Sequence, residues 1–124
     1  MDTETLLVRL QALADRSRLT MLQMLANGSI ATCCDRIEAY ERGCCVADVV
    51  TATGLSQPTV SHHLKVLEKA GLVRKEVRGP WTCYFPNPDG MNELLNTLNA
   101  YLSPVAQCAV PPEGCCNGST PAGR

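Results

Sequence analysis

The sequence predicts a mainly α-helical fold with one small β-hairpin, a winged helix-turn-helix. Residues 55–73 have the pattern of a capped helix with one apolar face and one polar, cationic face. A short apolar run that ends at Gly54 precedes this helix, which is the spacing of a helix-turn-helix. Two β-prone runs around Gly79-Pro80 follow it, and they indicate a hairpin.

Two amphipathic helices are expected before this motif. Leucines recur on one side of residues 3–14, and Leu19, Leu22 and Leu25 are expected to face inward in a second helix over residues 16–26. The Asn-Gly pair that follows should end the second helix. A chain of 124 residues is long enough for one domain with a small core.

A cysteine-bearing segment lies between these helices and the helix-turn-helix. Thr32 is a suitable cap for a short helix from Cys33 to about residue 42, in which Ile37 and Tyr40 would be buried. Cys44 and the residue after it would then stand at the start of the next helix. Because helix N-termini favour a thiolate, both places should lower the pKa of a cysteine thiol.

The second helix of the predicted helix-turn-helix, called the reading helix below, has clear ends and two distinct faces. Ser56 is a good N-cap, and Gly71 suits a left-handed C-cap. Val60, Leu64 and Leu67 fall on one face at helical spacing, while the opposite face is polar and basic. We expect the apolar face to pack on the preceding short helix.

The segment from Val46 to Phe85 resembles the ArsR/SmtB family of bacterial metal-responsive repressors. The run SQPTVSHHLKVLEKAGLV is highly specific for that family, and ALADRSRLTMLQML at residues 12–25 is similar to the motif of its second helix. The resemblance implies a homodimeric DNA-binding repressor that releases its operator when an ion binds. Residues 1–102 would form the DNA-binding and dimerisation domain, with residues 29–45 as a Cys-bearing insert and residues 103–124 as a flexible tail.

Positive charge is concentrated on the predicted DNA face. Residues 55–79 carry five basic and two acidic residues, although the whole chain has a net charge of −1. An acidic protein with a local basic surface is suited to binding DNA at one patch. The expected contacts to bases and phosphates are Ser56, Gln57, Thr59, Ser61, His62, Lys65, Lys69, Arg74, Lys75 and Arg78.

The last predicted helix, residues 90–102, carries a wide apolar stripe. Such a stripe needs a partner, and packing against a second copy of the chain is the solution that the resemblance implies. Pro104 is expected to end this helix. No apolar run is long enough to span a membrane and no signal peptide is evident, so we expect a cytoplasmic protein.

Eight cysteines in so short a chain indicate metal or redox chemistry. Six of them form adjacent pairs, which suggests chelation of a soft ion by neighbouring thiolates. Many arsenic sensors of the family begin their third helix with CVCDL, whereas this chain has CVADV, with Ala47 in place of the second cysteine. The expected primary metal site is Cys33, Cys34, Cys44 and Cys45, and the second candidate site is Cys108, Cys115 and Cys116; Cys83 is expected to be structural.

The donor types favour a thiophilic inducer. His62 and His63 are the only histidines and both lie in the predicted reading helix, which argues against a nitrogen and oxygen site. Trivalent arsenic or antimony, bound by three thiolates, fits best, while cadmium, lead and mercury remain open. A thiol redox sensor on the same fold is an alternative, and so is a soft-metal carrier. An enzyme is not expected, because a nucleophilic cysteine would have no histidine base away from the DNA face.

Overall fold

The computed structural model describes residues 2–32 and 36–109. Within these ranges the chain forms five α-helices, one short 3₁₀ helix and one antiparallel sheet of three strands, which is a winged helix-turn-helix. In chain order the elements are α1 (Thr3–Leu13), α2 (Arg16–Asn27), η1 (Ala39–Glu41), β1 (Cys44–Cys45), α3 (Val46–Thr53), α4 (Gln57–Lys69), β2 (Val73–Arg78), β3 (Trp81–Pro86) and α5 (Pro88–Ala109).

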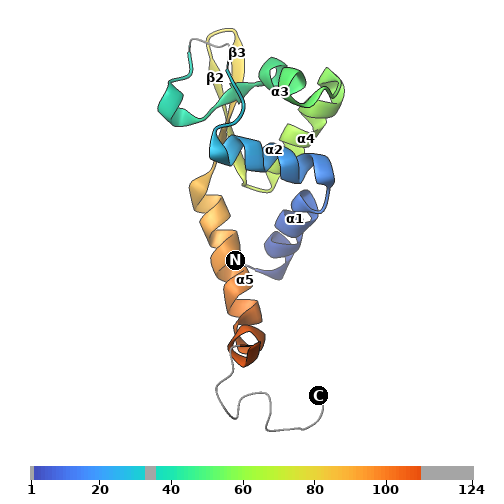
Figure 1. The fold of residues 1–124 in the computed structure, drawn as a ribbon, viewed down its shortest axis with the longest axis vertical. Coiled ribbons are helices and arrows are strands. Elements are labelled where there is room, and N and C mark those ends of the chain that lie inside the picture. Colours follow the sequence, from blue (N-terminus) through green and yellow to red (C-terminus); the bar gives the residue numbers. More distant parts are fainter. Residues whose placement is uncertain (1, 33–35, 110–124) are drawn as a thin grey trace.

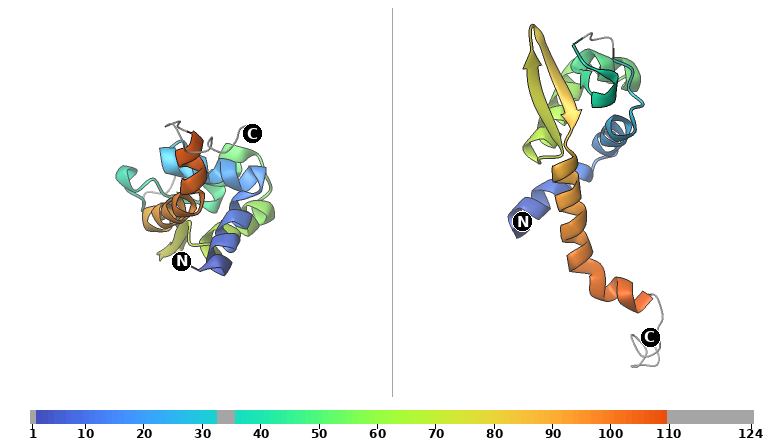
Figure 2. Two further views of the ribbon diagram at one scale, coloured as in Figure 1. Left: turned by 90° about the horizontal axis from the view of Figure 1, so that it is seen from below. Right: turned by 90° about the vertical axis from the view of Figure 1, so that its left-hand side faces the viewer.

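The molecule is elongated, with the hairpin at one end and α5 at the other (Figure 1). Helices α1 to α4 surround the core, and the β2–β3 hairpin projects past them, as the right-hand view of Figure 2 shows. The main core joins α1, α2, α3, α4 and the sheet through Leu6, Met21, Leu25, Val49, Val60, Leu64, Leu67, Leu72 and Tyr84. This packing fixes the outward face of α4 relative to the hairpin.

Short polar side chains begin the helices where the sequence predicts it. The side chains of Asp2, Asp15 and Ser56 accept hydrogen bonds from backbone N–H groups in the first turns of α1, α2 and α4, respectively. Gly28 and Gly54 end α2 and α3 in the left-handed conformation, with φ of 73° and 75°. The predicted helices α1, α2, α3 and α4 and the turn of the helix-turn-helix are therefore confirmed.

The sheet has the order β1-β3-β2, and its first strand is not apparent from the sequence. Strand β1 has two residues, Cys44 and Cys45, which pair with Tyr84 and Cys83 of β3. Side chains alternate between the two faces of a strand. One face of β3 turns Tyr84 into the main core, and the other turns Cys83 and Phe85 into a second, smaller cluster.

Three local predictions are wrong. The insert does not form a helix through residue 42, because its described part has only the single 3₁₀ turn η1; Ile37 is buried as expected, but Tyr40 is 82% exposed. Leu19 is exposed, and Met21 is buried in its place. The helix expected to end at residue 102 continues past Pro104 to Ala109.

The start of α5 is tied to the end of α4. Arg9 of α1 donates from Nε to the carbonyl oxygen of Ala70 (2.8 Å) and from a terminal nitrogen to that of Gly90 (3.3 Å), and it pairs with Glu93 (2.8 Å). A Cβ at Gly90 would overlap the carbonyl oxygen of Gly71, so this approach requires glycine. In the described part of the chain, no helix is long and apolar enough to cross a membrane.

Candidate nucleic-acid interface and thiol sites

Helix α4 presents the polar face that the sequence predicts. Ser56 caps the helix by accepting from the N–H of Thr59, and its hydroxyl also lies 2.9 Å from the Thr59 hydroxyl. The apolar face is fully buried, because Val60, Leu64 and Leu67 pack in the main core. The outward side chains expected to contact DNA are exposed, with Ser61 half-buried: Ser56, Gln57, Thr59, His62, Lys65 and Lys69.

A tight turn joins α3 to α4 and sets their crossing. Thr53 donates its hydroxyl to the carbonyl oxygen of Val49 and accepts from the N–H of Leu55. The left-handed Gly54 lies between these bonds, and its N–H reaches the carbonyl oxygen of Val50 (2.8 Å). Helix α4 is thereby held at a fixed angle on the short helix behind it (Figure 1).

His62 and His63 have different environments. His62 is exposed on the reading face, whereas Nδ1 of His63 lies 3.3 Å from the Arg18 guanidinium. Burial lowers the pKa of His63, Asp15 opposes this shift, and the charge of Arg18 adds to it. Because the neutral ring is favoured, His63 accepts from Arg18 and links α4 to α2.

The three basic residues of the hairpin are not equivalent. Lys75 is exposed, while the guanidinium groups of Arg74 and Arg78 lie over the Phe85 ring, 4.6 and 4.5 Å from its centre. Arg74 also pairs with Glu76. The Arg78 guanidinium makes two bonds to Glu41 (2.7 and 2.8 Å), one to Glu76 (2.8 Å) and one to the carbonyl oxygen of Arg36 (2.7 Å).

Arg78 therefore joins the insert to the wing, which leaves its guanidinium occupied by protein carboxylates rather than open to phosphate. The hydrogen bond from Arg78, together with one from the backbone of Glu38, lowers the pKa of Glu41 to about 2. Bonds from Arg78 and Arg74 likewise lower the pKa of Glu76. Both carboxylates are ionised at neutral pH, which keeps this link closed.

The adjacent cysteines of β1 face opposite sides of the sheet. Cys44 is fully buried in the main core, whereas Cys45 lies in the second cluster with Ile37, Cys83 and Phe85. Burial, and then the nearby Asp48 carboxylate and Cys83, raise the pKa of the Cys44 thiol to about 12. The expectation that a helix start lowers the pKa of this thiol is wrong, since Cys44 lies one residue before the N-cap Cys45 and its thiol is shielded from water.

Cys45 caps α3 together with Asp48. The Cys45 sulfur accepts from the N–H of Asp48, and the Asp48 carboxylate accepts from the N–H of Cys45 (2.9 Å). The same carboxylate oxygen accepts from the hydroxyl of Thr32 (2.9 Å), so Asp48 also fastens the insert to α3. Thr32 thus bonds to α3, although the sequence predicts it as a helix cap.

The two predicted cysteine sites lie largely beyond the described residues. Cys33, Cys34, Cys115 and Cys116 are outside them, and Cys108 falls in the last turn of α5. In residues 2–32 and 36–109, no group of three or more His, Cys, Asp or Glu side chains is arranged to hold a metal ion. Both assignments stay predictions.

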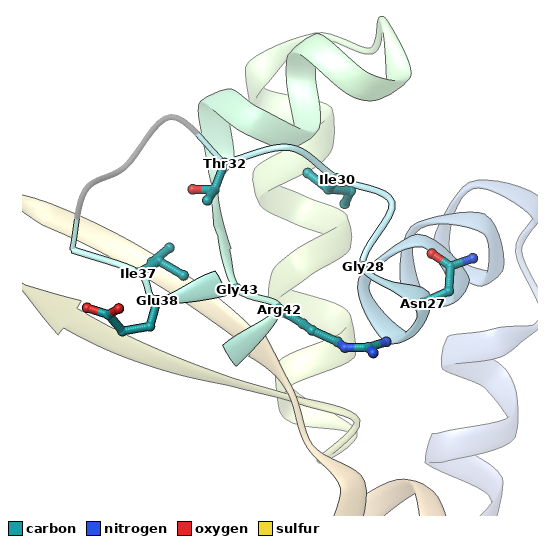
Figure 3. A pocket seen from close by; sticks show the side chains of 8 residues that line it. All are labelled: Asn27, Gly28, Ile30, Thr32, Ile37, Glu38, Arg42 and Gly43. Carbon is teal, nitrogen blue, oxygen red and sulfur yellow. The ribbon is translucent and has the colours of Figure 1, made fainter. Parts of the chain in front are cut away.

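A cavity of about 350 Å³ lies between the end of α2 and the insert (Figure 3). Arg42 reaches across it and donates to the carbonyl oxygen of Ala26 (2.6 Å), and Ile37 and Glu38 lie on the side of the hairpin. The cavity shows that the insert stands off α2 while it packs against the wing.

Comparison with known proteins identifies the fold family. Residues 40–75 match the family described as bacterial regulatory protein, arsR family. An arsenical resistance operon repressor of Bacillus subtilis is 32% identical over 88 residues, which are 71% of each chain. This chain belongs to the ArsR family.

A further relative and a solved structure agree with this assignment. An uncharacterized HTH-type transcriptional regulator of Methanocaldococcus jannaschii is 32% identical over 90 residues, 72% of this chain and 85% of that one. The homodimeric winged helix-turn-helix DNA-binding domain of a possible ArsR-family regulator from Mycobacterium bovis superposes with a TM-score of 0.58 at 26% identity, covering 80% and 81% of the two chains. The chain is thus an ArsR-family transcriptional repressor with a DNA-binding fold, and these relatives are regulators rather than enzymes.

Proposed function

We propose that this protein is a homodimeric repressor that releases a palindromic operator when trivalent arsenic or antimony binds to its cysteine thiolates. The observation that carries the proposal is the outward face of α4, where polar and basic side chains are exposed, together with the exposed Lys75 of the β2–β3 hairpin. One α4 helix would enter each major-groove half-site, about one helical turn apart. The name of the Bacillus subtilis relative supports an arsenic-linked role.

We assign the inducer to cysteine sulfur because both histidines have other roles. His62 is on the reading face and His63 binds Arg18, so neither is directed at a metal site. The proposed primary ligands are Cys33, Cys34 and Cys45 of the insert, without Cys44, which faces the main core. Cys108, Cys115 and Cys116 are proposed as a second site.

The mechanism rests on the position of Cys45 at the start of α3. An ion on its sulfur would remove the acceptor of the Asp48 N–H and so disturb the cap of the helix behind α4. A ligand shifts an equilibrium only by its differential affinity for two states, and roughly 1–3 kcal/mol of coupling is enough to regulate. A small change in the cap is therefore sufficient to alter DNA affinity.

Anaerobic titration of the protein–DNA complex tests the proposal. Arsenite should lower the fluorescence anisotropy of a labelled palindrome with all thiols reduced, and zinc should not. Release by peroxide alone would establish the redox alternative instead, and release by cadmium, lead or mercury at lower concentration than arsenite would assign a different ion. Equal release by zinc would refute the sulfur site.

Two variants decide which cysteines switch the protein. One replaces Cys108 by Ser and ends the chain after Ala109, which keeps the whole of α5. The other replaces Cys33 and Cys34 by Ser. We expect the first to release DNA at the wild-type arsenite concentration and the second to require a higher concentration; the reverse pattern would move the regulatory site to the tail.

A further inference from the structure

The register of the sheet pairs two cysteines that are far apart in the sequence. Cys45 of β1 lies directly opposite Cys83 of β3, and both side chains belong to the small cluster with Ile37 and Phe85. Opposite residues of an antiparallel pair have Cβ atoms about 4.5–5.5 Å apart, and their side chains share one face. The two sulfurs are therefore within reach of one ion.

The same geometry separates the pair that the sequence suggests. Cys44 and Cys45 are neighbours in one strand, so their side chains leave opposite faces of the sheet. Cys44 packs with Val49 and Tyr84 in the main core, whereas Cys45 does not belong to that cluster. A single ion cannot be chelated by both of these sulfurs while β1 stays paired with β3.

We propose that Cys45 and Cys83 form a two-thiolate binding site for trivalent arsenic, in which Cys83 of the wing supplies the second sulfur. This deepens the proposed function by naming a ligand of the inducer site, and it rests on that function for its biological role. Arsenous acid exchanges two of its hydroxyl groups for the two sulfurs. For each As–S bond that forms, one As–O bond breaks and the departing hydroxyl group takes up the thiol proton and leaves as water, and arsenic stays trivalent throughout.

Binding here would join the two DNA-contacting units. Cys83 pairs through the β2–β3 ladder with Glu76, next to the exposed Lys75, while Cys45 caps α3 behind the reading helix. An arsenic atom across β1 and β3 would therefore constrain the wing and the cap of α3 together. With arsenic bound, Cys45 and Cys83 could no longer pack in the small cluster as they do in the present structure.

The test uses a protein that retains only the described buried thiols. Replacing Cys33, Cys34, Cys108, Cys115 and Cys116 by Ser leaves Cys44, Cys45 and Cys83; we refer to this variant as the three-thiol protein. Native mass spectrometry after incubation with arsenite gives the number of As–S bonds. The mass of the adduct is lower than the summed masses of the protein and arsenous acid by one water for each bond. We expect one arsenic per chain with two waters lost.

Matched core variants assign the two sulfurs. In the three-thiol protein, Cys83→Ala or Cys45→Ala should abolish the adduct, while Cys44→Ala, which removes an equally buried thiol, should retain it. Far-UV circular dichroism and operator binding check that each variant folds. The water count in the three-thiol protein itself needs no core substitution, so the test stands even if Cys83→Ala does not fold.

The outcomes separate this inference from the proposed function. No adduct, three lost waters, or loss of the adduct with Cys44→Ala would overturn the Cys45–Cys83 site, even if arsenite releases DNA from the full chain. An adduct that depends on Cys45 and Cys83, with no DNA release by arsenite from the full chain, would uphold the site and reject the arsenite-responsive repressor.

Discussion

Single side chains in this protein often serve two elements at once, and Asp48 is the clearest case. It is a buried acid, 5% exposed, whose carboxylate accepts from the Cys45 N–H and the Thr32 hydroxyl. Buried polar groups that lose a partner cost more than an average hydrogen bond contributes. The aspartate in the CVADV segment is thus explained by structure, independently of any metal.

Asp48→Ala is expected to destabilise the protein by about 1–3 kcal/mol, because it leaves a buried N–H and a hydroxyl without their acceptor. Urea denaturation followed by circular dichroism measures the change. The control is Asp89→Ala, which removes an exposed acid from the first turn of α5. It should lower the free energy of unfolding by about a few tenths of a kcal/mol, the size of a helix-dipole interaction. Equal effects of the two variants would contradict the capping role.

His62 and Lys75 are expected to act differently on DNA. His62→Ala should relax sequence preference, because His62 is exposed on the reading face of α4. Lys75→Ala should weaken all duplexes alike and reduce the salt slope by about one, as expected for one lost phosphate contact. Anisotropy titrations on the operator and on a scrambled duplex at several salt concentrations measure both. A sequence-dependent loss with Lys75→Ala would reverse the assignment.

At the scale of elements, the insert and the wing form one unit. Arg78 joins them through Glu41 and through the carbonyl oxygen of Arg36. Below this link, Gly43 lies so close to the Phe85 ring that a Cβ would overlap it. The described part of the insert near Gly43 is therefore packed on β3.

Acid should open the Arg78–Glu41 link. The pKa of Glu41 is about 2 in the folded protein and 4.5 ordinarily, so its contribution to stability is present above the higher value and is lost as pH falls through the lower one. The difference in denaturation midpoint between wild type and Glu41→Gln should shrink from about pH 5 to about pH 2. Gln11→Ala, at an exposed position of α1, removes no ionisable group and is the control that should show no such trend; a constant difference for Glu41→Gln would exclude the link.

Gly43→Ala is expected to destabilise the protein by about 1–3 kcal/mol, the usual cost of overpacking. The added methyl group would overlap Phe85 and lie 3.2 Å from Ile37, so the insert must move away from β3. Hydrogen exchange should then increase in β1 and β3. The control is Ala31→Ser, at an exposed position of the insert, which should leave both stability and hydrogen exchange unchanged. If Gly43→Ala exchanges at the wild-type rate, the contact between Gly43 and the Phe85 ring is loose enough to accept a methyl group.

The elements that were predicted correctly are those whose pattern is local. Ser56, Gly54 and the spacing of Val60, Leu64 and Leu67 determine α3 and α4 within a few turns of chain. Strand β1 has two residues and exists only through its pairing with β3, so no periodicity could indicate it. Because that strand was not predicted, the sequence also gave no reason to bring Cys83 to Cys45.

At the scale of the whole molecule, α5 carries an apolar surface away from the core (Figure 1). Leu95, Tyr101 and Leu102 are exposed on this helix, and Leu7 and Val8 are exposed on α1. An exposed apolar surface of this kind is typical of an interface. Its apolar stripe was predicted from the leucine spacing, but the extension of α5 to Ala109 was not, since Pro104 was expected to end the helix.

Leu95→Glu with Leu102→Glu is expected to convert a dimer into a monomer and to weaken binding to a palindrome by at least tenfold, because two half-sites would no longer be bound together. Light scattering on a sizing column and anisotropy titrations measure the two effects. Asn96→Glu, also exposed on α5, is the control for added charge. A double variant that remains dimeric would place the interface elsewhere.

The burial of Cys83 beside the shortest strand of the sheet also has a kinetic consequence. Its sulfur is fully covered, and β1 lies at the edge of the sheet with only two residues to hold it. Any thiol reagent must therefore wait until this edge opens. At high reagent concentration the labelling rate of Cys83 should become independent of concentration and equal the opening rate of β1. The limiting labelling rate of Cys83 thus measures how fast the insert separates from the wing.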